Sequence, residues 1–215
     1  MEENMSVTAV VLSAGISSRM GKPKQLIPFL GVPMLQAVIQ KLLPFPFESI
    51  MAVVGDRGEE IRAKVCISDA RFRWISNDHY RDGMSTSVIE AVKQCNNESS
   101  AGLLVVLGDQ PLLTKQTIGT VVDAIRDLGD GASRCVIQTV YRGRPGHPVF
   151  IPSALFAHVH ELSGDQGAKP LFKYAERRIQ VHVGDLGAIA DVDTPDDYRN
   201  AIRIAELKRI RDVTL

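Results

Sequence analysis

Residues 7–24 read VTAVVLSAGISSRMGKPK, a short apolar run that passes directly into a loop rich in glycine, serine and basic residues. Residues 7–12 are apolar or β-branched throughout, a pattern typical of a strand that is buried on both faces of a sheet. In an open α/β sheet, ligands bind beyond the carboxyl ends of the strands. The loop from Ser13 to Lys24 is therefore expected to lie at a ligand-binding edge.

Further segments of the chain repeat the strand and helix patterns in alternation. Strand-like runs occur at Ile50–Val54, Leu103–Leu107, Val136–Val140 and Ile179–Val183. Apolar residues with helical spacing occur at Leu35–Leu42, Val88–Val92 and Ile118–Ile125, and a last helix is expected from Thr194 with Pro195 at its first position. This alternation predicts an α/β fold, a Rossmann-like three-layer sandwich with a mostly parallel sheet.

The segment from Gly143 to Leu171 is richer in glycine, proline and histidine and breaks the alternation. We expect it to be an insertion over the carboxyl edge of the sheet. No repeat, linker or low-complexity tract divides the rest of the chain, so a single domain over residues 1–215 is predicted.

The composition excludes several classes of protein. The 215 residues include 25 basic and 25 acidic side chains, so the basic excess typical of a nucleic-acid binder is missing. No apolar run approaches the ~20 residues that a membrane helix needs, and the polar start at Met1–Ser6 does not resemble a secretory signal. The three cysteines, Cys66, Cys95 and Cys135, show no CxxC spacing. Structural thiols and a reducing, cytoplasmic location are expected.

The first loop combines the groups that bind a triphosphate: flexible backbone, hydroxyl donors and positive charge. They are supplied by Gly15, Gly21, Ser17, Ser18, Arg19, Lys22 and Lys24. The loop is not a Walker A motif, because five residues separate the glycines and Lys22 is followed by proline rather than a hydroxyl residue. The dinucleotide fingerprint GxGxxG is also missing. The alternative interpretation is a surface loop with solvated charges.

Two acidic segments are candidates for a metal site. Asp109 directly follows the run 103–107 and should face the same crevice as the first loop; Mg²⁺ commonly takes one or two carboxylates together with phosphate oxygens. Asp191 and Asp193 are two apart, so in an extended segment both point to one side. Each has a structural alternative: Asp109 as a turn former, and Asp193 or Thr194 as the cap of the last helix.

Five motifs, in order along nearly the whole chain, resemble those of the MobA-like NTP transferases, and among them the molybdenum cofactor cytidylyltransferases. The first spans residues 12–21 together with Lys24 and Gly31-Val32-Pro33. The others are Asp82-Gly83-Met84-Ser85, Gly108-Asp109-Gln110-Pro111, Gly146-His147-Pro148 and Asp191-Val192-Asp193-Thr194-Pro195. Each motif alone is weak, but five in sequence are specific.

The resemblance implies a fold of the nucleotide-diphospho-sugar transferase type, with an acceptor-binding insertion around residues 141–171. It implies Mg²⁺-dependent transfer of CMP from CTP to molybdopterin, release of pyrophosphate, and a molybdoenzyme that receives the product. The catalytic residues are then Arg19, Lys24 and Asp109, with Asp109 and Asp193 holding the metal. The nucleotide-binding residues are Leu12, Ser13, Ala14, Gly15, Ser17, Ser18, Gly21, Lys22, Gly55, Asn77, Gly83 and Ser85. The acceptor-binding residues are His147, Asp165, Gln166 and Lys169.

Some alternatives stay open within this resemblance. Ser13 and Ala14 stand where guanylyl-transferring relatives tend to carry glycine, which favours cytidine as the base. A guanylyltransferase, a sugar- or polyol-phosphate nucleotidyltransferase, and a non-catalytic accessory protein for a molybdenum hydroxylase of the xanthine dehydrogenase type remain alternatives. Among the other histidines, we expect His158 and His160 at a helix surface and His182 in a strand.

Overall fold

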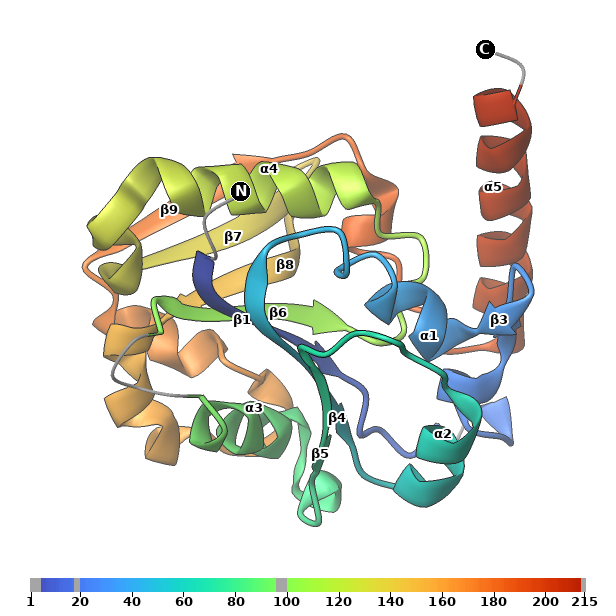
Figure 1. Cartoon of the computed structure of the whole chain (residues 1–215), viewed down its shortest axis with the longest axis horizontal. Helices are drawn as coiled ribbons and strands as arrows, with labels where there is room; N and C mark the ends of the chain where they lie inside the picture. Colours follow the sequence, from blue (N-terminus) through green and yellow to red (C-terminus); the bar gives the residue numbers. More distant parts are fainter. Residues whose placement is uncertain (1–4, 18–19, 96–99, 214–215) are drawn as a thin grey trace.

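The computed structural model describes residues 5–17, 20–95 and 100–213 and is built around one seven-stranded sheet (Figure 1). The strand order is β5-β4-β1-β6-β8-β7-β9. Neighbouring strands are parallel except where β8 pairs antiparallel with β6 and β7. The strands are β1 (Met5–Leu12), β4 (Phe47–Val54), β5 (Phe72–Ser76), β6 (Gly102–Leu107), β7 (Cys135–Tyr141), β8 (Arg144–Pro152) and β9 (Arg177–His182).

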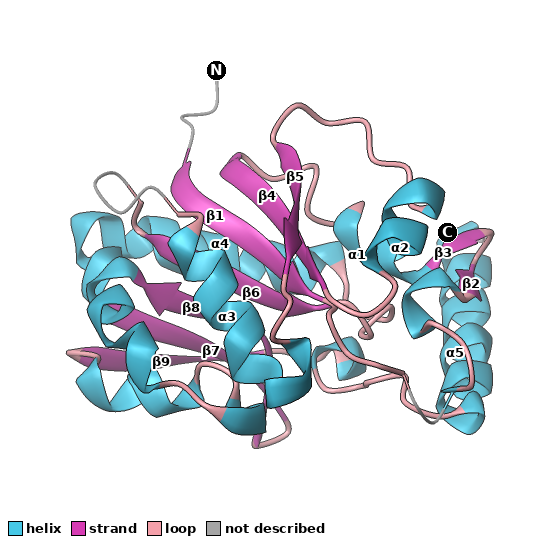
Figure 2. Ribbon diagram, turned by 90° about the horizontal axis from the view of Figure 1, so that it is seen from below, coloured by secondary structure: helices cyan, strands magenta, loops and turns pink. Residues whose placement is uncertain are grey.

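Helices cover both faces of the sheet (Figure 2). Alternate residues of each strand point to opposite faces of the sheet. Val7, Ala9 and Val11 of β1 pack in a core with α1 and α4, whereas Val10 and Leu12 pack in a second core with α3. The helices are α1 (Met34–Ile39), α2 (Gly58–Lys64), α3 (Met84–Lys93), α4 (Lys115–Leu128) and α5 (Pro195–Val213). The predicted three-layer class is confirmed.

Helix α5 stands at one end of the molecule beside a short hairpin, formed by β2 (Pro28–Phe29) and β3 (Val32–Pro33) (Figures 1 and 2). Its start follows the capping chemistry expected from the sequence. The amide of Asp197 donates to Thr194 Oγ1 (3.2 Å), and the amide of Thr194 donates back to Asp197 Oδ2 (2.8 Å). This reciprocal pair is a capping box, so Thr194 is the residue that caps the helix.

All five strands predicted from the sequence are present, but four others were missed. The short β5 has mixed burial at the sheet edge, and β8 contains three prolines and a glycine that suppress a strand pattern. Helix α2 buries only Ile61, so it has no apolar stripe to detect. Helix α1 ends at Ile39, before Leu42, although Leu42 is buried.

The segment expected as an insertion around residues 141–171 begins inside the sheet. Residues 144–152 form β8, between β6 and β7. The following residues form short 3-10 helices, at Ser153–Glu161, Gly164–Gln166 and Lys169–Tyr174. Leu155, Phe156 and Leu171 from these turns pack in the core on the α3 side. The segment 153–174 is thus anchored to the same core as α3.

The cysteines are unpaired: Cys66 is exposed, and Cys95 and Cys135 are buried. Across the residues that the structure describes, none of the helices combines the length and the apolar character required to cross a membrane.

Lys41 carries a partly buried positive charge just beyond α1. Its ammonium group donates a hydrogen bond to the carbonyl oxygen of Pro111. Burial lowers the pKa of Lys41 to about 8; Asp185 opposes this shift, while Lys208 and Lys115 add to it. Below pH 8 the lysine is charged in the folded protein, although burial makes this charge less favourable there than in the unfolded chain.

We expect Lys41→Met to stabilise the protein at pH 7 by about 2 kcal/mol. The shift from 10.5 to about 8 corresponds to a cost of at most about 3 kcal/mol, and the lost hydrogen bond offsets about 1 kcal/mol. Because the folded-state pKa is depressed, the wild-type protein regains stability as the pH rises from 8 to 10.5. Urea unfolding at pH 7 and pH 10 should show the advantage of the variant shrinking at the higher pH. The exposed Lys64→Met is the control, and an unchanged midpoint for Lys41→Met at pH 7 would contradict the assignment.

Candidate active site

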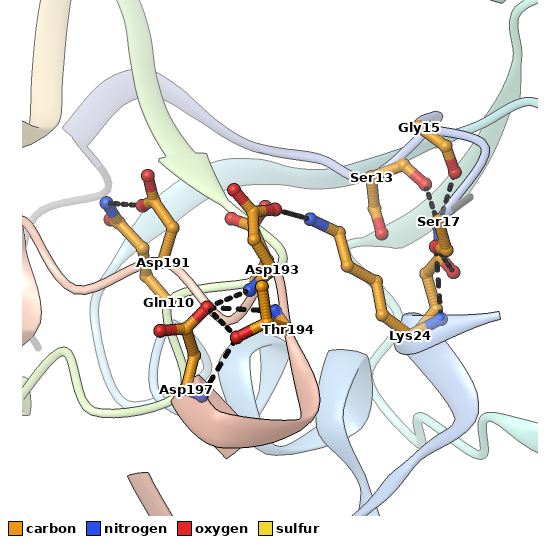
Figure 3. Close-up of polar contacts among 11 residues, drawn as sticks. Ser13, Gly15, Ser17, Lys24, Gln110, Asp191, Asp193, Thr194 and Asp197 are labelled. Carbon is orange, nitrogen blue, oxygen red and sulfur yellow. Dashed lines mark hydrogen bonds and ion pairs between the residues drawn. The ribbon is translucent and has the colours of Figure 1, made fainter. Parts of the chain in front are cut away.

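The loop after β1 is held in a closed turn by a buried glutamine. Gln25 is 2% exposed, and its side-chain amide donates to the carbonyl oxygens of Ser13 (2.8 Å) and Gly15 (3.2 Å) (Figure 3). The amide of Lys24 donates to Ser17 Oγ (3.1 Å). Ser17 has a φ of 57°, a left-handed conformation that costs energy unless its surroundings hold it. Gln25 was not predicted as a site residue, since one polar side chain at a turn gives no sequence pattern.

Lys24 links the first loop to two carboxylates from distant parts of the chain. Its Nζ lies 2.5 Å from Asp109 Oδ2 and 3.0 Å from Asp193 Oδ1 (Figure 3). The lysine side chain is 15% exposed. Burial lowers its pKa, but the charges and hydrogen bonds of Asp109 and Asp193 outweigh burial and raise the pKa of Lys24 above its ordinary value. The lysine is therefore a firmly charged cation between two acids.

The same acids suit a divalent cation. Asp109 Oδ1 is buried and has no hydrogen-bond partner among the described residues, so one carboxylate oxygen is left for a ligand. Nearby, Asp191 Oδ1 accepts from Gln110 Nε2 at 2.8 Å. Burial raises the pKa of Asp191, and the charges of Asp109 and Asp193 raise it further, which indicates an excess of negative charge in the site. Mg²⁺ prefers such oxygen ligands.

Among residues 5–17, 20–95 and 100–213, no group of three or more histidine, cysteine or acidic side chains is arranged to hold a metal by itself. A cation that takes one or two carboxylates and completes its shell with substrate oxygens and water needs no such group. Asp109 and Asp193 are therefore two oxygen donors of the kind that a divalent cation takes together with water and substrate oxygens.

A cavity of about 470 Å³ opens over this cluster, at the carboxyl ends of β1 and β6. Its lining includes eight residues that were predicted for the nucleotide, the metal or catalysis: Leu12, Ala14, Gly15, Ser17, Lys24, Gly83, Asp109 and Asp193. It also includes Asp191, the alternative to Asp193 as a metal ligand, and residues that were not predicted for this site: Ile16, Tyr80, Arg81, Met84, Ser87, Leu107 and Asp165. The first loop and the two acidic segments thus face one cavity.

Several predicted nucleotide-binding residues lie behind the wall of this cavity instead of lining it. Asn77 is 1% exposed; it donates to Thr86 Oγ1 and Ser87 Oγ and accepts from the amide of His79. The buried hydroxyl of Ser85 faces two carbonyl oxygens of the 163–167 loop.

Two further pairs of predicted residues also lie outside the lining. Ser13 packs against Gly108, and a Cβ added at Gly108 would lie 2.7 Å from the Oγ of Ser13. Gly55 has no room for a Cβ beside the ring of Tyr80. Gly21 and Lys22 are exposed and do not line the cavity. Ser18 and Arg19 lie outside the described residues.

A second cavity, of about 760 Å³, adjoins the first and shares Leu12, Met84 and Asp165 with it. The four predicted acceptor-side residues line it: His147, Asp165, Gln166 and Lys169. Lys173 and Arg178, which were not predicted, line it too. Burial lowers the pKa of His147 to about 4, so the imidazole is neutral near pH 7 and cannot act there as a cation. The basic side chains in the lining are those of Lys169, Lys173 and Arg178.

The three histidines expected outside the site, His158, His160 and His182, lie where the sequence indicated. The ring of His158 stacks on that of Tyr174, with centroids 3.6 Å apart, and His160 is exposed. His182 ends β9.

Comparison with known proteins agrees with this geometry. Residues 9–181 match the family model of the MobA-like NTP transferase domain. The chain is 26% identical over 196 residues to the molybdenum cofactor cytidylyltransferase of Escherichia coli (strain K12), covering 91% of this chain and 95% of that protein. It is 27% identical over 197 residues to the purine catabolism protein PucB of Bacillus subtilis (strain 168), covering 88% and 92%. The structure of Rv0371c from Mycobacterium tuberculosis H37Rv in complex with manganese superposes with a TM-score of 0.70, at 25% identity, and covers 93% of this chain and 98% of that one.

Proposed function

The chain belongs to the MobA-like NTP transferase family and is a nucleotidyltransferase, and from this premise we propose that it transfers CMP from CTP to molybdopterin. The observation that carries the proposal is the contact of Lys24 with Asp109 and Asp193 inside one cavity. A cation and two carboxylates meet there beside a loop whose backbone can reach phosphates. A second cavity adjoins it, as a two-substrate reaction requires.

In the proposed reaction, a phosphate oxygen of the acceptor attacks the α-phosphorus of the triphosphate in line. The new P–O bond forms as the bond to the β-phosphate oxygen breaks, and pyrophosphate leaves. The chain contributes by positioning and charge: Gly15 and Ser17 hold the phosphates, Lys24 binds the α-phosphate, and Arg19 stabilises the departing pyrophosphate. Magnesium, held by Asp109 and Asp193, would supply further neutralisation of phosphate charge.

The cytidine preference is supported by the shape of the first loop. Ala14 lines the nucleotide cavity and is 7% exposed, so its methyl group takes space that a glycine would leave open. Ser13 lies outside the cavity lining, against Gly108, so of the two residues only Ala14 bears on the base. The space filled at Ala14 favours the smaller, one-ring base. The sequence likeness to the cytidylyltransferase of Escherichia coli supports the same choice.

A second candidate concerns the recipient of the product. The relative in Bacillus subtilis is named a purine catabolism protein. That name favours a molybdenum hydroxylase of the xanthine dehydrogenase type as the enzyme that takes the finished cofactor. The name is also compatible with the alternative that this chain is an accessory protein for such a hydroxylase and binds nucleotide without turnover.

We expect pyrophosphate release from CTP in the presence of Mg²⁺ and molybdopterin. The assay pairs each of CTP, GTP, ATP and UTP with molybdopterin or with sugar and polyol phosphates. Pyrophosphate release with GTP alone would show that the base is guanine and not cytosine. Release only with a sugar or polyol phosphate would show that molybdopterin is not the acceptor. Nucleotide binding by calorimetry with no release under any pairing would favour the accessory-protein alternative and contradict the proposed turnover.

A further inference from the structure

The amino end of α3 and the loop of residues 163–167 are fastened together between the two cavities. Ser85 is fully buried, and its Oγ lies 3.1 Å from the carbonyl oxygen of Ser163 and 3.1 Å from that of Gly167. A hydroxyl has one proton, so it donates to one of these oxygens at a time. The amide of Met84 donates to Asp165 Oδ1 at 3.2 Å. Two side chains thus connect the loop to the helix.

The two backbones also approach unusually closely. Gly83 has a φ of 108°, and a Cβ at this position would overlap the backbone of Gly164. Helix α3 starts at Gly83 without a capping side chain from its own end. The first amides of a helix have no partner within the helix. One of them, the amide of Met84, donates a hydrogen bond to Asp165, which is distant in sequence. The contact is therefore specific in both geometry and charge.

This junction forms part of the wall of both cavities. Gly83, Met84 and Asp165 line the nucleotide cavity, while Met84, Asp165 and Gly167 line the acceptor cavity. Met84 is 39% exposed and lines both spaces. A ligand in the nucleotide cavity can therefore touch Gly83 and Met84, to which the loop that lines the acceptor cavity is bonded.

We propose that Ser85 and Asp165 are positioning residues that clamp the 163–167 loop to α3, so that a bound nucleotide orders the acceptor cavity. The inference rests on the proposed two-substrate function and adds an order to it, with nucleotide binding favouring acceptor binding. By linkage, the acceptor tightens nucleotide binding by the same factor. Asp165 acts in this scheme through its hydrogen bond to Met84, not by touching the acceptor.

Steady-state kinetics with CTP and molybdopterin separate this role from direct contact. Ser85→Ala and Asp165→Ala should raise the KM for molybdopterin at saturating CTP roughly tenfold, within the usual range of coupling between sites, while the Kd for CTP, measured by calorimetry without acceptor, changes by less than about threefold. Asp165→Asn keeps an oxygen that can accept from Met84 and should stay near wild type. Equal damage from Asp165→Asn and Asp165→Ala would overturn the positioning role of Asp165.

A matched control tests whether any lost buried hydroxyl has this effect. Ser100 is 6% exposed, and its Oγ lies 3.5 Å from the carbonyl oxygen of Ser6 and 3.3 Å from that of Gly102, at the opposite end of β6. Ser100→Ala should leave the KM for molybdopterin and the Kd for CTP unchanged. If Ser100→Ala and Ser85→Ala raise the KM for molybdopterin equally, the clamp is refuted.

Hydrogen–deuterium exchange tests the clamp without any acceptor. In the wild-type protein, CTP with Mg²⁺ should slow exchange in the peptide that spans residues 163–167, and in Ser85→Ala this protection should be lost. Absence of protection in the wild-type protein, with calorimetry showing that CTP is bound, would overturn the proposal. Protection by CTP without any pyrophosphate release in the presence of molybdopterin would leave the clamp standing and would count only against the proposed acceptor.

Discussion

The Asp109→Asn variant is expected to release pyrophosphate on the order of 10²-fold more slowly than the wild-type protein. Asparagine keeps the shape of the side chain but removes its charge. Asp109 meets Lys24 through Oδ2, and its Oδ1 is buried without a hydrogen-bond partner among the described residues, so the carboxylate has an oxygen to give to a metal. Loss of the charge weakens both interactions. Initial rates at saturating CTP and Mg²⁺ measure the effect.

The fall in rate should be accompanied by weaker metal binding. Titration with Mn²⁺, followed by electron paramagnetic resonance in the presence of CTP, should show a higher Kd for Asp109→Asn. Asp127→Asn changes the net charge by the same amount on the exposed face of α4, and it should behave as wild type in both measurements. A variant at Asp109 that kept the wild-type rate would remove this residue from the catalytic site.

The positions of Lys24 and Asp109 could be expected from sequence because both follow recognisable strands. Val7–Leu12 and Leu103–Leu107 are neighbouring parallel strands, paired from Val7 with Gly102 to Leu12 with Leu107. Residues that follow the carboxyl ends of two such strands must emerge at the same edge of the sheet. Local patterns were sufficient here because the sheet itself brings the two segments together.

The wall between the cavities could not be predicted in the same way. Ser85 looked like a nucleotide ligand because it opens a helix at the correct edge. Its direction depends on how α3 is rotated against a loop 78 residues further along the chain. Gln25 and Tyr80 are further examples, since each takes its place from packing that no local periodicity records. Side-chain direction at a junction of distant segments is a tertiary property.

The Lys24→Met variant should lose activity and yet bind a divalent cation more tightly in the absence of nucleotide. The ammonium of Lys24 lies 2.5 Å from Asp109 and 3.0 Å from Asp193, the two carboxylates proposed to hold magnesium. While it stays there, it neutralises the charge that would attract the metal. Methionine fills a similar volume without charge. Turnover should fall on the order of 10²-fold, because the cation at the α-phosphate is lost.

The gain in metal affinity follows from Coulomb's law at short range. Removing a cation within 4 Å of two carboxylates makes the site more favourable for another cation by several kcal/mol at an intermediate dielectric, and solvent reduces this, so we expect a Kd for Mn²⁺ roughly tenfold lower. Lys24→Arg, which keeps the charge, is the control and should show no gain. The opposite effects on turnover and metal affinity distinguish removal of a competing cation from damage to the fold, which would weaken both.

If Lys24→Met bound Mn²⁺ no better than the wild-type protein, the lysine and the metal would not share these carboxylates. In that case the cation would have to be held elsewhere. With the expected result, the triphosphate gains a second role: it offers Lys24 a new partner and thereby frees the carboxylates for the metal that arrives with it.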